Sequence, residues 1–192
     1  MTQTIKKYLN DNFAARWTAL VLVASMMFFA YMFVDVLSPL STLLETTKGW
    51  SAEAYGTFCS SEYFLNVFAF FLIFAGIILD KMGIRFTGIL SGSVMVIGAA
   101  IKLYALSDMF SADSALYGFL DSFWTSFPPT AKLASVGFMI FGCGVEMAGV
   151  TVSKAIARWF KGKEMALAMG LEMAIARAVY MGHNFPSKEH IN

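Results

Sequence analysis

The sequence predicts an all-α membrane protein, and two features of its composition lead to this class. Hydrophobic residues make up 58% of the chain and charged residues 14%, whereas about a quarter of a soluble domain is charged. The hydrophobic residues also form runs of the length, about 20 residues, that crosses a bilayer as a helix. The net charge is only +1, so the chain lacks the basic surface that is typical of nucleic-acid-binding proteins, and we expect no nucleic acid as a partner. The apolar runs lead us to expect a lipid bilayer as the partner.

Residues able to bind metals or to catalyse reactions are scarce. Cys59 and Cys143 lie in or beside apolar runs, where they are expected to be small buried hydrophobic residues. His183 and His190 lie near the C-terminal end without the spacing of metal ligands. No Ser/His/Asp set can be assembled in the apolar runs. We therefore expect no metal, no cofactor and no enzymatic activity.

The chain opens with a basic segment and a first spanning helix. Residues 1–16 are polar and basic, and we expect them to lie on the cytoplasmic surface. An apolar run then begins at Trp17 and predicts a helix over about 17–40, long enough to span the bilayer. Pro39 disfavours helical geometry at Ser38 and so predicts an end nearby.

A loop and two further helices are expected next. After a polar loop that begins at Thr42, Ser51 and the acid that follows it have the pattern of a helix start, which predicts a second helix over about 52–79. A short charged turn separates it from a third helix over about 87–106. The third helix is rich in Gly and Ser, and such small residues let membrane helices approach closely.

A long external loop, residues 107–132, interrupts the pattern. It contains Pro128-Pro129 and several aromatic residues, which we expect at the membrane interface, in part as a short helix. Two more helices follow over about 133–157 and 164–181, joined by a basic turn. A polar tail, residues 182–192, ends the chain.

The basic residues indicate the orientation of the chain. The expected helices place most of them on one side of the membrane, which by the positive-inside rule is the cytoplasmic side and includes the N-terminus. We accordingly expect a multi-pass protein of the cell (inner) membrane. The cytoplasmic set comprises Lys6, Lys7, Arg16, Lys81, Arg85, Lys154, Arg158, Lys161 and Lys163, and the opposite side holds Lys48 and Lys132.

The charged turn has a recognisable pattern, with Gly76, Asp80, Lys81, Gly83 and Arg85 at fixed spacing. It resembles the signature between the second and third helices of the major facilitator superfamily of secondary transporters. That family usually has another basic residue where Phe86 stands. The resemblance implies a cytoplasmic latch, in which the acid pairs with basic groups and helix N-termini of the second half of the transporter. Ordinary positive-inside topology is the alternative, and it explains the two cations but not the acid and the glycines.

The stretch from Arg158 to Arg177 adds a narrower similarity. It is similar to the connection between the fourth and fifth helices in the branch that includes lysosomal dipeptide carriers and their bacterial relatives. The resemblance covers about 17–178. The superfamily has twelve spans in two halves, whereas this chain has room for about five. We therefore expect the N-terminal portion of such a helical bundle, which would not transport alone because alternating access needs both halves.

Six ionisable residues fall within the expected helices, where burying a charge is costly and marks a candidate site. Counted at 1.5 Å per residue, Glu146 and Arg177 lie roughly 18 and 20 Å from the basic turn, near the level of the midplane, and Glu172 roughly 12 Å from it. The remaining three are expected toward the outer ends of their helices, where they could reach solvent. They are Asp35, Glu62 and Lys102.

These depths give two readings of the predicted site. In the first, Arg177 receives a substrate carboxylate and Glu146 an amino group or a coupling proton, with Glu172 and Asp35 as further members. In the second, Glu146 and Arg177 only neutralise each other. For Asp35 and Glu62, a gating role and a solvated position are both open.

The sequence as a whole predicts a secondary carrier of small organic solutes, with short peptides as the preferred substrate. Transport would be proton-coupled and would proceed by alternating access. The alternative, from another class, is a non-transporting membrane fragment or an assembly partner.

Overall fold

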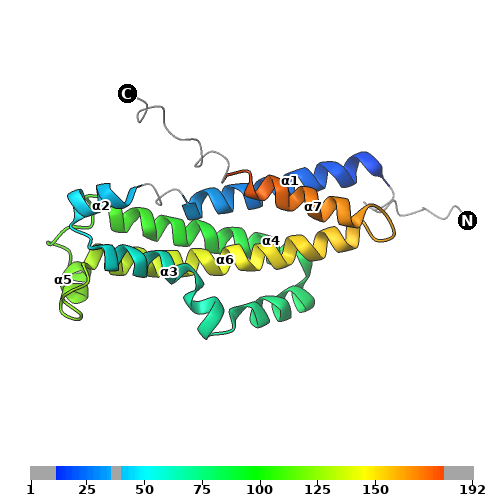
Figure 1. Cartoon of the computed structure of the whole chain (residues 1–192). Coiled ribbons are helices and arrows are strands. Elements are labelled where there is room, and N and C mark those ends of the chain that lie inside the picture. The colour runs from blue at the N-terminus through cyan, green and yellow to red at the C-terminus, as the bar shows by residue number, and fades with distance from the viewer. Residues whose placement is uncertain (1–11, 36–39, 180–192) are drawn as a thin grey trace, which may run out of the picture. The chain divides into compact units, whose positions relative to one another are not determined.

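The structure is a computed structural model that describes residues 12–35 and 40–179, and all regular structure in these ranges is helical (Figure 1). Three helices, α1, α4 and α6, are long and apolar enough to cross a membrane. The predicted all-α membrane class is therefore confirmed for this part of the chain, whereas the expected five spans stay a prediction. The helices are α1 (Phe13–Asp35), α2 (Ser41–Lys48), α3 (Ala52–Phe68), α4 (Phe71–Leu106), α5 (Ala115–Asp121), α6 (Pro129–Trp159) and α7 (Met165–Arg177).

Some expected segments lie outside the described residues. They are most of the basic N-terminal segment with Lys6 and Lys7, the end of the expected first span, and the end of the expected fifth helix with the polar tail. The described helices belong to two compact units, one of residues 1–34 and 151–192 and the other of residues 35–150.

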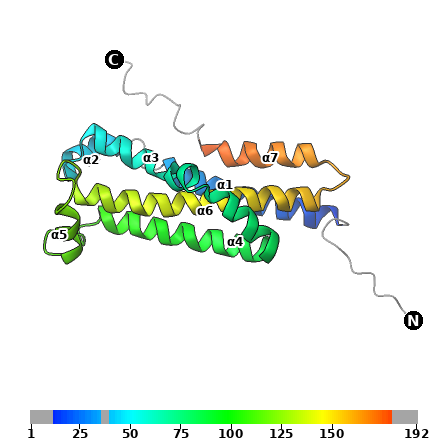
Figure 2. The ribbon, with the colours of Figure 1, turned by 90° about the horizontal axis from the view of Figure 1, so that it is seen from below.

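Helices α4 and α6 lie side by side and antiparallel within the unit of residues 35–150 (Figures 1 and 2). Gly98 of α4 faces Phe141 of α6, and Met95, one turn earlier on α4, faces Gly144 further along α6. Because the numbering falls on one helix as it rises on the other, the two helices run in opposite directions. This is the arrangement expected of consecutive membrane-spanning helices.

Helix α3 packs against the same α6 in a parallel direction. The rings of Phe58 and Phe138 stack with centroids 4.8 Å apart, and one turn later Glu62 faces Gly142. Both numbers rise together along the two helices. Helix α6 is therefore the centre of this unit, with α3 on one side and α4 on another.

Glycines bring these backbones into direct contact. A Cβ atom built on Gly98 would lie 2.7 Å from the Cα atom of Phe141, and one on Gly137 would lie 2.7 Å from the backbone nitrogen of Lys102. A Cβ atom on Gly142 would lie 2.8 Å from the Cγ atom of Glu62. No side chain fits at such distances, so the close packing predicted from the small residues is present along α6.

The second and third predicted helices differ in detail from the structure. The helix expected over 52–79 is interrupted after Phe68, and Phe70 has a left-handed backbone with φ of 50°. The next element, α4, consists of two helices that meet at a kink at Gly83, whose φ is 83°, within the turn that the sequence predicts between residues 79 and 87. That conformation favours glycine because it has no Cβ atom to clash. The turn of the sequence motif is therefore a kink at Gly83.

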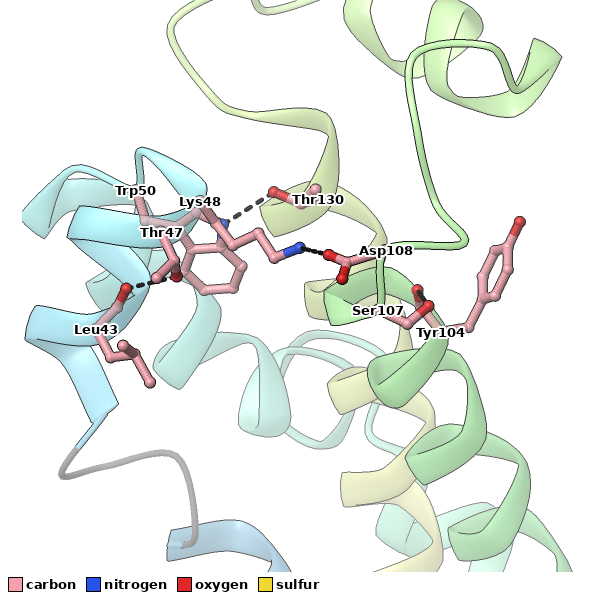
Figure 3. Close-up of polar contacts among 8 residues, drawn as sticks. All are labelled: Leu43, Thr47, Lys48, Trp50, Tyr104, Ser107, Asp108 and Thr130. Atoms are coloured by element: carbon pink, nitrogen blue, oxygen red, sulfur yellow. Dashed lines mark hydrogen bonds and ion pairs between the residues drawn. The ribbon is translucent and has the colours of Figure 1, made fainter.

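The expected loop after Thr42 is partly helical. Helix α2 covers Ser41–Lys48 and ends at Gly49, whose left-handed φ of 67° lets its N–H donate to the carbonyl oxygen of Glu45. Figure 3 shows that the neighbouring Trp50 donates its ring N–H to Thr130 at 2.9 Å, and that Lys48 pairs with Asp108 at 3.0 Å. These bonds attach the segment around α2 to both ends of the 107–132 connector.

The connector itself contains α5, which agrees with the short helix predicted there. Lys132, one of the two lysines expected on the outer side, lies in the first turn of α6 and is buried. Its ammonium group donates to the carbonyl oxygens of Leu120 and Phe123 and lies over the Phe123 ring. The end of α5 is thereby attached to the start of α6.

The unit of residues 1–34 and 151–192 has a buried cation at the start of α1. Arg16 is 3% exposed, donates to Glu164 at 3.3 Å, and lies 4.9 Å from the centre of the Phe160 ring. Trp17 packs edge-on against the same ring. The expectation that Arg16 ends a surface segment is wrong, because α1 begins at Phe13 and the guanidinium finds a carboxylate and an aromatic face.

The glycine contact between α4 and α6 can be tested on one helix. Gly98→Ala inserts a methyl group against the α6 backbone, and we expect it to cost about 1–3 kcal/mol of stability through overpacking. The matched control is Gly92→Ala on the same helix, where a Cβ atom would meet nothing within 4 Å. Thermal unfolding in detergent should show a lower midpoint for Gly98→Ala alone. Equal midpoints would contradict the contact.

Candidate functional site

Opposite charges are buried together in the unit of residues 35–150. Glu62 on α3 and Lys102 on α4 are each 5% exposed. Of the two positions left open for Glu62, the solvated one is therefore wrong, and Lys102 does not reach solvent at the end of its helix. Both helices turn these residues toward α6, and the depth of a residue along its own helix does not reveal that direction.

Lys102 is held by the face of α6. Its Nζ atom lies 4.6 Å from the centroid of the Phe138 ring and 5.3 Å from that of the Phe141 ring. An ammonium group over an aromatic face is attracted by the negative face of the ring, and more strongly where water is absent. Gly137 allows this approach, since any side chain there would meet the backbone of Lys102.

Glu62 is the centre of a wider group of charges. It lies within electrostatic range of two other carboxylates, Glu146 on α6 and Asp35 at the end of α1, and of the cation Lys102. The methylene groups of Glu62 lie against Gly142, so this carboxylate and the α6 backbone are in close contact. The group, which we call the Glu62 cluster, thus consists of Asp35, Glu62, Lys102 and Glu146.

The structure brings only part of the predicted site together. Glu146 and Asp35 belong to the Glu62 cluster. Glu172 and Arg177 lie on α7, in the other unit, where Glu172 is half-buried and Arg177 exposed. The predicted partnership of Glu146 and Arg177 therefore stays a prediction.

The sequence did not lead us to predict that Glu62 and Lys102 are buried together. A signal for them existed in the sequence of α6, where Phe138 and Phe141 are three residues apart and therefore share a helix face. A pair of aromatic faces opposite a lone lysine in an apolar helix is a favourable site for a cation.

The predicted latch residues lie around the kink in α4. Three of them are exposed: Asp80, Lys81 and Arg85. Gly83 has a positive φ of 83°, which explains why the motif has glycine at that position. Just after the kink, the Thr87 hydroxyl donates to the carbonyl oxygen of Gly83 at 2.9 Å. The pairing of the acid with another half of a transporter stays a prediction.

The remaining motif residue is Gly76, which is half-buried and helical. A Cβ atom there would meet nothing within 4 Å. The packing within this chain therefore gives no reason for a glycine at this position.

Long apolar helices that enclose buried charges define a multi-pass helical membrane protein. Within this class, the chain is similar to the lysosomal dipeptide transporter MFSD1. It is 31% identical to the human and bovine proteins over 105 residues, which are 54% of this chain and 18% of theirs. It is 32% identical to the mouse protein over 113 residues, 58% of this chain and 20% of that one. No family model and no solved structure matches the chain.

These relatives confirm the resemblance predicted from the motif, because MFSD1 is a member of the major facilitator superfamily. The chain spans about a fifth of the length of the curated relatives it matches. Their names describe transporters, not enzymes, and place them in the lysosome. The expected location in the cell (inner) membrane therefore stays a prediction.

The buried pair can be tested by a double-mutant cycle on Glu62 and Lys102. Glu62→Gln or Lys102→Met alone leaves one buried charge without its opposite, and each should cost about 3–5 kcal/mol. The double variant should be more stable than either single variant, since no uncompensated charge remains. Thermal unfolding in detergent measures all four proteins, and strictly additive effects would show that the two charges do not interact.

Proposed function

We propose that this chain is the N-terminal portion of a secondary carrier that moves short peptides across a membrane by alternating access. The observation that supports this most strongly is the buried Glu62 cluster within apolar helices. Charges in such helices are costly and mark substrate or ion pathways by default. The similarity to dipeptide transporters supports the substrate class.

The proposed roles follow the chemistry of a zwitterionic peptide. Arg177 receives the carboxylate, because its planar guanidinium can donate two parallel hydrogen bonds. Glu146 exchanges the coupling proton or receives the amino group, with Asp35 and Glu172 as further acidic positions.

Uptake by proteoliposomes tests the proposal. The complete gene product should take up a labelled dipeptide, and Arg177→Ala should lower kcat/KM about 100-fold or more because a buried carboxylate would lose its partner. The matched control is Arg158→Ala at the end of α6, which removes a cation from the basic turn and should keep uptake within about twofold. Unchanged uptake in Arg177→Ala would remove this residue from the site.

Proton coupling has its own test in the same vesicles. An inwardly directed proton gradient should drive accumulation of the dipeptide above its external concentration, and Glu146→Gln should abolish the accumulation while leaving facilitated equilibration. Equilibration without accumulation in the wild type would exclude coupling while leaving peptide transport intact.

The latch residues give a separate prediction. Asp80→Asn removes the charge that helix N-termini would stabilise, and we expect uptake to fall about 10-fold as the outward-open state loses population. Lys81→Gln, the neighbouring control, should fall less because topology alone accounts for that cation. Uptake at matched amounts of inserted protein measures both. Equal losses would favour the topological reading.

A non-transporting membrane fragment or assembly partner is the second candidate. The complete gene product, reconstituted alone, decides between them, because a carrier takes up the dipeptide and an assembly partner does not. Uptake above that of empty vesicles would exclude the second candidate.

A further inference from the structure

The environment of Lys102 has the composition of a binding site for an organic ammonium group. Two aromatic faces, Phe138 and Phe141, lie 4.6 and 5.3 Å from its Nζ atom, and the buried carboxylate Glu62 lies within electrostatic range. Aromatic faces combined with an anion recognise alkylammonium ions by the same attraction. In this chain the ammonium group beside the two rings is that of Lys102.

The carboxylates around this position favour the binding of a cation. Glu62 is also within electrostatic range of Glu146, a second carboxylate on α6. Two neighbouring carboxylates in an apolar bundle are costly to bury, and a cation beside them lowers that cost. A ligand that brings an ammonium group would therefore be stabilised beside Glu62.

We propose that Phe138, Phe141 and Glu62 form a receptor for the ammonium terminus of a peptide, and that Lys102 is a tethered ammonium that occupies this receptor when no substrate is bound. Lys102 is then a specificity-determining residue, because an incoming amino terminus must compete with it for Glu62. The assignment of a peptide as the ligand rests on the proposed function. The receptor for an alkylammonium ion does not.

The receptor can be tested on the 192-residue chain in detergent. Lys102→Ala removes the propylammonium part of the side chain, so propylammonium ions should bind in the vacated space and raise the unfolding midpoint by about 2–4 °C at saturating concentrations. Neutral 1-propanol is the matched ligand control and should have no such effect.

Two variants serve as controls for this rescue. Lys102→Met fills the space without a charge and should not respond to propylammonium. The double variant Lys102→Ala/Glu62→Gln keeps the space but loses the anion, and should not respond either. If Lys102→Ala does not accumulate as a folded protein, propylammonium added during purification should restore the folded yield. No rescue in either form, or an equal response to 1-propanol, would overturn the receptor.

The competition with substrate is tested by transport of two peptides in the complete gene product. Lys102→Met should lower the KM for a dipeptide with a free amino terminus by roughly 2–30-fold, the range that one cation–π contact covers. The KM for the N-acetylated dipeptide should not change. Lys48→Met removes a cation from the exposed pair with Asp108 and should leave both values unchanged.

The outcomes separate this inference from the proposed function. A wild type that transports neither peptide would refute the proposed function, while propylammonium rescue would still support the receptor. A wild type that transports dipeptides, with Lys102→Met altering both peptides alike or raising the KM of the free one, would refute the competition and leave transport intact.

Discussion

The close approach of α6 to its two neighbours is the constraint on which the unit of residues 35–150 depends. At Gly98, Gly137 and Gly142 the backbone of one helix touches the next, so there is no space for even a methyl group. Within lipid there is little hydrophobic gain from pairing helices, and association relies on such contact and on polar interactions. The glycines therefore do more than allow packing, because they also set how near a charged side chain on α3 or α4 comes to α6.

The buried charges follow from this geometry. Lys102 projects from α4 at the level where Gly137 brings the helices together, and its ammonium group consequently lies over two rings of α6. Glu62 comes to α6 by the equivalent contact at Gly142. A cation over aromatic faces and a carboxylate on the neighbouring helix lower the cost of burial for each other. Neither side chain would be stable in this position alone.

The sequence predicted most of the long helices, but not the direction in which their charged side chains point. The lengths of apolar runs predicted α1 and α6, and the glycines predicted close helix packing. The interruption at Phe70 could not be predicted, since neither glycine nor proline marks it. Helix α2 could have been, because Gly49 after a lysine is a common helix end. The burial of Glu62 and Lys102 depends on which face meets α6, and that is a property of three helices together.

The buried amine of Lys132 has a mechanical consequence. Its bonds to the carbonyl oxygens of Leu120 and Phe123 tie the segment after α5 to the first turn of α6. The position of the connector is therefore linked to that of α6, the helix that lines the Glu62 cluster. Lys132 thus joins the two segments by side-chain hydrogen bonds in addition to the continuous backbone.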